Sequence, residues 1–214
     1  MNKLWVKTNK IIKQLFSNYV WSIPTNEPIV YLTFDDGPTP EITEWVLFQL
    51  KEYNAKATFF CIGNNIKKYP EIFKKVIEEG HAIGNHTFNH VKGWKTSNKT
   101  YINEVESCEE VIRKSFLKHQ PTKLFRPPYG KIKPSQSRIL RKKGYKIIMW
   151  DVLSVDFDVN ITSQNCLNNV IENIENGSII VFHDSVKAFQ NLEYTLPETL
   201  DFLKNKGFVC EKLP

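Results

Sequence analysis

The sequence has no long apolar run and no closely spaced pair of cysteines. No segment approaches the ~20 consecutive apolar residues of a membrane-spanning helix. The few cysteines are far apart and form no Cys-x-x-Cys pair, which excludes a cysteine-rich zinc knuckle, and we expect buried thiols. These are Cys61, Cys108, Cys166 and Cys210. Aromatic and basic residues do not interleave in a repeat, so nucleic acid is not an expected partner.

The N-terminus is basic, but no apolar core of a secretory leader, ~7–15 residues long, follows its lysines. We therefore expect a cytoplasmic protein, or one at the cytoplasmic membrane face. Residues 9–20 pattern as a short basic amphipathic helix with Ile11, Ile12, Leu15 and Phe16 as its apolar residues. Such a helix either caps the domain or makes peripheral contact with a membrane surface. We separate residues 1–24, as a basic amphipathic segment, from a domain over 25–214.

Length and composition indicate one folded unit. A chain of 214 residues suits a single domain, for which we expect a monomer. Hydrophobic residues make up 41% and aromatic residues 13%, which is enough for a large core. The net charge is +6, spread along the chain with acids between the lysines. This charge indicates either a soluble basic surface or attraction to an anionic partner, such as a membrane face or an acidic glycan.

Short apolar runs alternate with longer helical patterns, which predicts a parallel α/β sheet, open or closed into a barrel. The expected strands are Ile29–Phe34, Ala57–Cys61, Ala82–Asn85, Lys123–Arg126, Lys146–Asp151, Ser178–His183 and Phe208–Leu213. The expected helices lie near 41–53, 65–79, 99–118, 134–143, 162–175 and 190–206. Glycines 80, 144 and 207 follow three of these helices, where a helix stop is expected.

Polar residues stand where five of the expected strands end. They are Asp35 and Asp36, Asn85 and His86, Arg126, Asp151, and His183. In a parallel α/β fold the carboxyl ends of the strands share one face, where active sites are built. We therefore expect these side chains to gather there.

Two of these groups have the composition of a metal site. His86 and His90 are four residues apart, so on a helical turn both rings share one face. Asp35 and Asp36 follow an apolar strand and precede Gly37-Pro38, which predicts a turn. Either pair alone is common without function. Together they supply three ligands and one spare acid, and a hydrolytic site needs such an acid to take a proton from water.

Each of the remaining candidate site residues could instead have a purely structural role. Arg126 opens a rigid Pro-Pro loop and could pair with any carboxylate. His183 follows an apolar strand and could be a core histidine, and Asp156 could be a loop acid. For Asp151 and Asp184 we keep the structural interpretation.

In combination, these residues resemble the five motifs of the polysaccharide deacetylase family, the NodB homology domain of carbohydrate esterase family four. The resemblance spans residues 29 to about 210. The motifs read Thr33-Phe34-Asp35-Asp36-Gly37-Pro38, His86-Thr87-x-x-His90, Arg126-Pro127-Pro128-Tyr129-Gly130, Asp156-Phe157 and Val181-Phe182-His183-Asp184. Two positions depart from the usual pattern: Phe157 replaces a Trp, and Val181 replaces a Leu.

The resemblance implies a single-domain distorted (β/α) barrel with about seven parallel strands, and a residue set for hydrolysis. Asp36, His86 and His90 would hold a divalent metal, most often Zn²⁺, although the ligand set also suits Co²⁺, Fe²⁺ or Mn²⁺. Asp35 would be the general base, held ionised by Arg126. His183 would be the general acid, tuned by Asp156. Tyr129 would donate its backbone N–H to the oxyanion.

The expected activity is metal-dependent removal of N-acetyl groups, with release of acetate, from an amino sugar in a glycan or glycolipid. Trp150, Val181 and Phe157 are candidates for an apolar wall around the acetyl methyl. Two alternatives stay open: the same site acting as a deacylase or deformylase on another amide, and a silent glycan-binding module. Retention of Asp35 and His183 argues against the silent module, because binding alone needs neither base nor acid.

Overall fold

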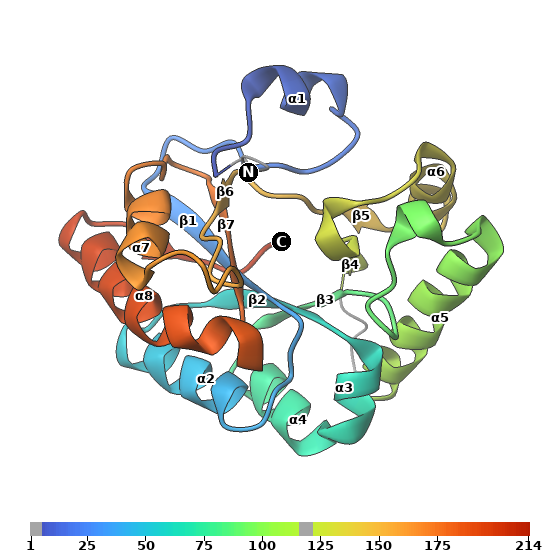
Figure 1. Ribbon diagram of the computed structural model, residues 1–214, viewed down its shortest axis with the longest axis horizontal. Coiled ribbons are helices and arrows are strands. Elements are labelled where there is room, and N and C mark those ends of the chain that lie inside the picture. Colours follow the sequence, from blue (N-terminus) through green and yellow to red (C-terminus); the bar gives the residue numbers. More distant parts are fainter. Residues whose placement is uncertain (1–5, 116–121) are drawn as a thin grey trace.

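The computed structural model describes residues 6–115 and 122–214, and it contains one curled parallel sheet wrapped by helices (Figure 1). The strands run in the order β5-β4-β3-β2-β1-β7-β6, and β8 pairs with β1 outside this path. The strands are β1 Ile29–Asp35, β2 Ala57–Cys61, β3 Ala82–Asn85, β4 Leu124–Phe125, β5 Lys146–Ile147, β6 Val152–Leu153, β7 Ile179–His183 and β8 Val209–Cys210. All their pairings are parallel, which confirms the predicted distorted barrel.

The helices are α1 Lys10–Leu15, α2 Ile42–Glu52, α3 Gly63–Lys68, α4 Pro70–Glu78, α5 Asn98–Lys114, α6 Pro134–Lys142, α7 Ser163–Ile171 and α8 Val186–Asn205, with short 3-10 turns η1 Gly93–Lys95 and η2 Pro128–Gly130. Helices α2 to α8 cover the outer face of the sheet in Figure 1. None of the helices in the described part of the chain is both long and apolar enough to cross a membrane.

Two predicted elements divide in the structure. The helix expected over 65–79 is two helices, α3 and α4, because Pro70 lacks an N–H and Tyr69 before it leaves the helical region at φ −128° and ψ 58°. The end of the helix expected over 99–118 lies partly outside the described residues. The strand expected over 146–151 is also wrong as one element. Only its first two residues form a strand, β5, and the chain then crosses to β6, which begins at Val152 and lies at the opposite edge of the sheet.

The chain between β5 and β6 crosses the seam of the barrel, and the N-terminal segment fills the rest of that seam. Val20 exchanges backbone hydrogen bonds with both sides of Ile148, donating to Ile147 and accepting from Met149. On the other edge, Leu153 donates to the carbonyl of Val6. Figure 1 shows α1 above the gap between β6 and β5. The described part of residues 1–24 thus contacts both edges of the sheet, while the domain boundary itself stays a prediction.

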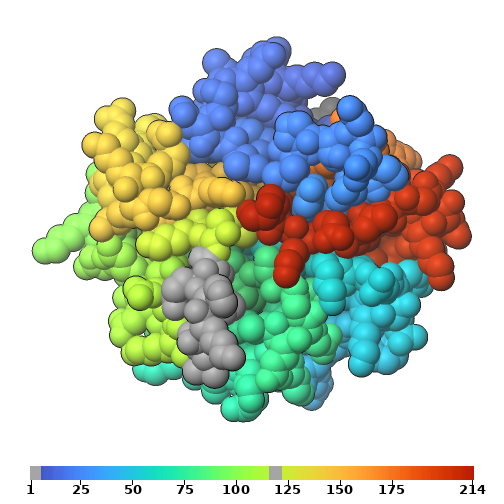
Figure 2. Space-filling model, turned by 180° about the vertical axis from the view of Figure 1, so that it is seen from behind, coloured from blue at the N-terminus to red at the C-terminus, as the bar shows by residue number. Residues whose placement is uncertain are grey.

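The C-terminus packs against residues of β1 and β2 and is seen in red at the back of the molecule in Figure 2. Leu213 is buried in one apolar cluster with Tyr31 and Phe60, and its N–H donates to the Thr58 hydroxyl at 2.9 Å.

Candidate active site

The structure brings Asp36, His86 and His90 together at the carboxyl ends of β1 and β3. One potential ligand atom from each residue lies within 4.8 Å of the other two. The Nε2 atoms of His90 and His86 lie 3.2 and 3.7 Å from the same Asp36 oxygen, Oδ1. His86 is buried, whereas Asp36 and His90 are partly open. The cluster therefore faces solvent on one side, as a site that must admit substrate requires.

The His86 ring is fixed by a hydrogen bond to the Arg126 backbone. The Nδ1–H of His86 donates to the backbone carbonyl of Arg126 at 2.7 Å, which leaves the lone pair of Nε2 facing Asp36. Burial, with the neighbouring His90, lowers the pKa of His86 to about 4 against the opposing charges of Asp35 and Asp36, so its ring is neutral at neutral pH. A neutral imidazole with a fixed tautomer is the form that binds metals.

Asp36 Oδ1 is a buried oxygen with no hydrogen-bond donor among the described residues, although two imidazole nitrogens lie close to it. An unpaired buried carboxylate oxygen is costly, and a cation between the three donors would satisfy it. Two imidazoles and one carboxylate also match the donors of catalytic zinc sites. The residues present therefore fit a divalent metal.

The Asp35 carboxylate is paired with the guanidinium of Arg126. Arg126 is completely buried, and its Nη1 donates to Asp35 Oδ1 at 2.7 Å. The same guanidinium donates to the Thr33 hydroxyl and to the carbonyl of Met149. Burial favours the neutral carboxyl of Asp35, but the charge and hydrogen bond of Arg126, together with the charge of His183, outweigh it and hold the pKa of Asp35 below the usual value. Asp35 is thus an ionised carboxylate with a fixed orientation.

Opposite this pair, the Asp156 carboxylate holds His183 at the end of β7. Oδ2 accepts the backbone N–H of His183 and Oδ1 accepts its ring Nδ1–H, both at 2.8 Å. Burial opposes the charged ring, but Asp156, helped by Asp36 and Asp35, raises the pKa of His183 to about 9. His183 therefore carries a proton at neutral pH.

Unusual backbone geometry concentrates in these same segments. A positive φ is rare outside glycine, and it costs of order 1–3 kcal/mol where surrounding structure must hold it. Seven described non-glycine residues have a positive φ, and five belong to the site segments: Asp36, Thr87, His90, Tyr129 and Val155. Val155, at φ 65°, is β-branched and directly precedes Asp156. The strained turns therefore concentrate in the segments that carry the site residues.

The remaining predicted residues lie around this centre. The ring of Tyr129 lies 4.7 Å from that of His90, and the ring of Phe157 lies 5.0 Å, edge-on, from that of His183. Phe157, Trp150 and Val181 share one apolar cluster. Trp150 also packs on Gly130, where an added Cβ would come within 2.6 Å of its ring. The candidate apolar wall therefore adjoins both His183 and the Arg126 loop.

Asp184 and Thr33 support the site in ways that the sequence did not reveal. Asp184 accepts the N–H of Gly37 at 3.0 Å and the hydroxyl of Thr43 at 2.6 Å, which ties the turn after Asp36 to β7. A Cβ at Gly37 would meet this carboxylate, so only glycine fits there. Thr33, quoted in the first motif without a role, accepts from Arg126 and donates to Ile180. No spacing rule predicts such cross-strand contacts.

Asp151 was expected among the strand-end residues but lies away from the site. Because the predicted 146–151 strand does not exist as one element, Asp151 precedes β6 and sits at the amino ends of the strands. Its carboxylate accepts from Lys7, Lys13 and the Ser178 hydroxyl at 2.5–2.7 Å. It anchors the N-terminal segment, in agreement with its structural interpretation.

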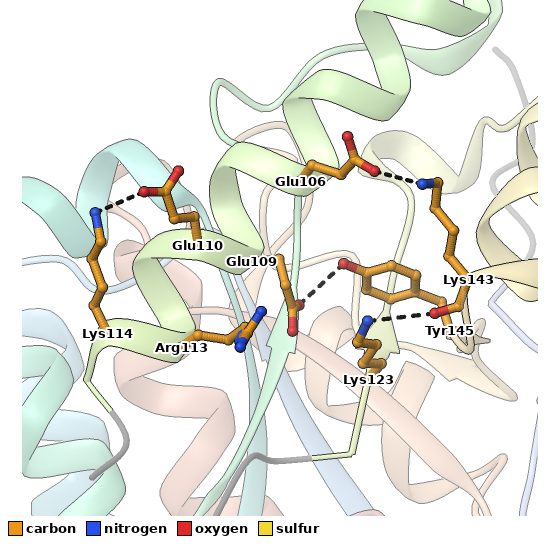
Figure 3. A pocket seen from close by; sticks show the side chains of 8 residues that line it. All are labelled: Glu106, Glu109, Glu110, Arg113, Lys114, Lys123, Lys143 and Tyr145. Atoms are coloured by element: carbon orange, nitrogen blue, oxygen red, sulfur yellow. Dashed lines mark hydrogen bonds and ion pairs between the residues drawn. The ribbon is translucent and has the colours of Figure 1, made fainter.

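A pocket of about 560 Å³ lies on another part of the surface, along α5 and before β4 and β5 (Figure 3). Its acids are engaged: Glu106 pairs with Lys143, Glu110 with Lys114, and Glu109 accepts from the Tyr145 hydroxyl. The lining is completed by Arg113 and Lys123. No residue of the site described above contributes to it.

Comparison with known proteins agrees with this geometry. The family model for polysaccharide deacetylase matches residues 22–148. The chain belongs to the polysaccharide deacetylase family. It is 37% identical to a peptidoglycan-N-acetylglucosamine deacetylase of Bacillus cereus, over 92% of this chain and 70% of that one. It is 32% identical to a chitooligosaccharide deacetylase of Azorhizobium caulinodans, over 90% of this chain and 96% of the relative.

Solved structures of polysaccharide deacetylases share the fold throughout. The crystal structure of the Bc1960 peptidoglycan N-acetylglucosamine deacetylase superposes with a TM-score of 0.87 at 35% identity. The match covers 97% of this chain and 95% of that one. The whole described domain is therefore built as in this relative.

Proposed function

We propose that this protein is a metal-dependent N-deacetylase acting on an amino sugar of a glycan, most simply N-acetylglucosamine, with release of acetate. The observation that carries the proposal is the arrangement of Asp35 and His183. An ionised carboxylate and a protonated imidazole stand at neighbouring strand ends, beside a three-donor cluster. Hydrolysis of an amide needs a base for the water and an acid for the leaving amine. The relatives are named as deacetylases of N-acetylglucosamine or of chitooligosaccharide, and these names support the N-acetyl amide as the bond that is cleaved.

Asp36, His86 and His90 would hold the divalent cation, for which the donor set favours Zn²⁺ over Co²⁺, Fe²⁺ or Mn²⁺. When bound, such a cation polarises the acetamide carbonyl and lowers the pKa of water at the site.

Asp35 would take a proton from the attacking water as the new C–O bond to the acetyl carbon forms. Arg126 keeps Asp35 ionised and in place. His183 would then give its Nε2 proton to the amide nitrogen as the C–N bond breaks, which leaves acetate and the free amine. Asp156 keeps that proton on His183 before the transfer and holds the ring in position.

Tyr129 and the apolar cluster would position the acetyl group. Tyr129 stands at φ 60° beside His90, and this turn supports donation of its backbone N–H to the developing oxyanion. Trp150, Val181 and Phe157 would enclose the acetyl methyl. The cluster is small and apolar, and it adjoins His183.

The exposed face of α1 supports a proposed place of action, at the cytoplasmic membrane face. Ile11 and Leu15 are 63% and 70% exposed, and Phe16 beside them is 45% exposed. Exposed apolar side chains on a short basic helix suit peripheral contact with anionic lipid. Sedimentation with anionic vesicles tests this, and a chain that stays in solution, or an Ile11→Ser, Leu15→Ser variant that still sediments, contradicts it.

The test of the activity is acetate release from a panel of N-acetylated glycans by purified protein, with and without chelator. Release that stops with chelator and returns with Zn²⁺ supports the proposal. Formate or a longer acid from other amides, with no acetate, would favour a deformylase or deacylase. Tight glycan binding without any release would favour a silent binding module.

A further inference from the structure

One rim of the site presents two exposed aromatic rings. Trp94 and Tyr129 are 59% and 57% exposed, although large aromatic side chains are usually well buried. Tyr129 contacts the His90 ring, and Trp94 stands on the η1 turn four residues after His90. Flat exposed rings next to a glycan site offer large contact area at small entropic cost. We name Trp94, Tyr129, Lys92 and Lys131 together the aromatic rim.

The two loops that form the aromatic rim are locked to each other. Trp94 Nε1 donates to the Ile132 carbonyl at 3.1 Å, and the Gln136 amide donates to the Gly93 carbonyl at 3.0 Å. A Cβ at Gly93 would lie 2.4 Å from the Lys131 carbonyl, so only glycine permits this approach. The aromatic rim is therefore a fixed surface, because moving one loop would break the hydrogen bonds that join it to the other loop.

Each ring carries a lysine that has no carboxylate partner among the described residues. Lys92 Nζ lies 4.6 Å from the centre of the Tyr129 ring, and Lys131 Nζ lies 5.1 Å from that of Trp94. The printed sequence has no Asp or Glu in 91–103 or in 127–150. The ammonium groups are thus held over the rings while their charge remains available.

We propose that the aromatic rim binds a glycan in which a carboxylate-bearing sugar stands next to the N-acetylated sugar that is cleaved. Trp94 and Tyr129 stack on the sugar faces, and Lys92 and Lys131 pair with the carboxylate. The inference rests on the proposed N-deacetylase function and adds the charge class of the substrate. Positive charge fixed beside the site also speeds the encounter with an anionic chain, in a manner that salt suppresses.

The test compares kcat/KM for acetate release from a neutral chito-oligosaccharide and from a carboxylated glycan of equal length. We expect the Lys92→Gln, Lys131→Gln double variant to lose about five- to tenfold on the carboxylated glycan and to keep its rate on the neutral one. Raising NaCl from about 50 mM to 300 mM should lower the wild-type rate only on the carboxylated glycan, and this salt effect should vanish in the variant. Lys95→Gln, an exposed lysine of the same loop, is the matched control and should change neither rate.

An equal loss on both glycans, or an unchanged rate on the carboxylated one, overturns the inference. If neither glycan releases acetate, the proposed function fails. A direct measurement of glycan binding then tests separately whether the aromatic rim binds the carboxylated glycan. In that arm, calorimetry measures the affinity of the Asp35→Asn protein for the carboxylated glycan, with and without the two lysine changes. An affinity that is the same with and without the two lysine changes contradicts the inference.

Discussion

The Asp156 carboxylate holds His183 at two points, the backbone N–H and the ring Nδ1–H, each at 2.8 Å. Two hydrogen bonds to one carboxylate fix both the position and the rotation of the ring. The Nε2 atom of His183 therefore points in one fixed direction. The same contact keeps a proton on the ring at neutral pH. The pair comes from a loop and a strand that are 27 residues apart, and the left-handed Val155 turn aligns them.

The first prediction concerns the pH dependence that Asp156 sets. Because the pKa of His183 is raised from 6.5 to about 9, the protonated acid persists through neutral pH and is lost as pH rises through about 9. We expect kcat/KM to fall above that pH. In Asp156→Asn the alkaline limb should move to lower pH by about one to three units, the usual effect of an adjacent opposite charge. Asp158→Asn, two residues on, is the control and should leave the limb in place; a limb that also stays in place in Asp156→Asn contradicts the role of Asp156.

The second prediction concerns the metal. His86→Ala should lower bound Zn²⁺, measured by elemental analysis of purified protein, since it removes one of three donors. His183→Ala provides the matched histidine control, because its ring is held by Asp156 and does not belong to the donor cluster. Full occupancy in His86→Ala would remove that residue from the metal site.

The third prediction separates base from ligand. Asp35→Asn should retain metal but lose roughly two to four orders of magnitude in kcat, the usual worth of a positioned proton-transfer group. His183→Ala should lose a similar factor. Should Asp35→Asn instead lose metal and recover turnover when metal is added, Asp35 would be a ligand and the roles of the two aspartates would be reversed.

Strand-end reasoning predicts much of the site because it depends on local patterns. Asp35, His86, Arg126 and His183 each follow an apolar strand, and a parallel sheet sends such residues to one edge. It fails at Asp151, because the chain there crosses the barrel seam. That crossing depends on bonds from Val20 and Val6, more than a hundred residues away, which no local pattern encodes.

Other features needed the folded structure for a different reason. The split at Pro70 is an exception: we expected one helix over 65–79, although the sequence alone could have predicted the break, since proline cannot continue a helical hydrogen-bond ladder. The role of Asp184 was not, because it depends on Gly37 and Thr43 meeting the end of β7 in space. The aromatic rim likewise depends on two loops that are brought together by the fold.

The fourth prediction concerns stability. Asp151 is buried, with Lys7 and Lys13 on its two oxygens. Burial favours its neutral form, but the lysines and Ser178 outweigh this and hold its pKa below the usual value. Its contribution to stability is therefore present above the unfolded-state value of about 4 and is lost as pH falls through the folded-state pKa. Replacing both lysines by Met leaves a buried unpaired charge and should cost about 3–5 kcal/mol in urea unfolding at pH 7.

Adding Asp151→Asn to that double variant removes the unpaired charge and should restore part of the loss. This variant is the internal control, since it leaves both Met substitutions in place. A double variant as stable as the wild type would show that the N-terminal segment is held by its backbone bonds alone.

The last prediction concerns Phe157, where the family usually has Trp. Its ring meets His183 edge-on and packs against Val155 and Val181, so it lines the acid side of the site. Phe is smaller than Trp and has no N–H donor, which leaves this side wider and less polar. Phe157→Trp should therefore shift kcat/KM away from glycans with bulky substituents beside the acetamide and toward plain chito-oligosaccharide. Phe48→Trp, on an exposed position of α2, is the control for a surface aromatic change. Equal substrate ratios in Phe157→Trp and the wild type would mean that Phe157 only packs against the barrel and does not set specificity.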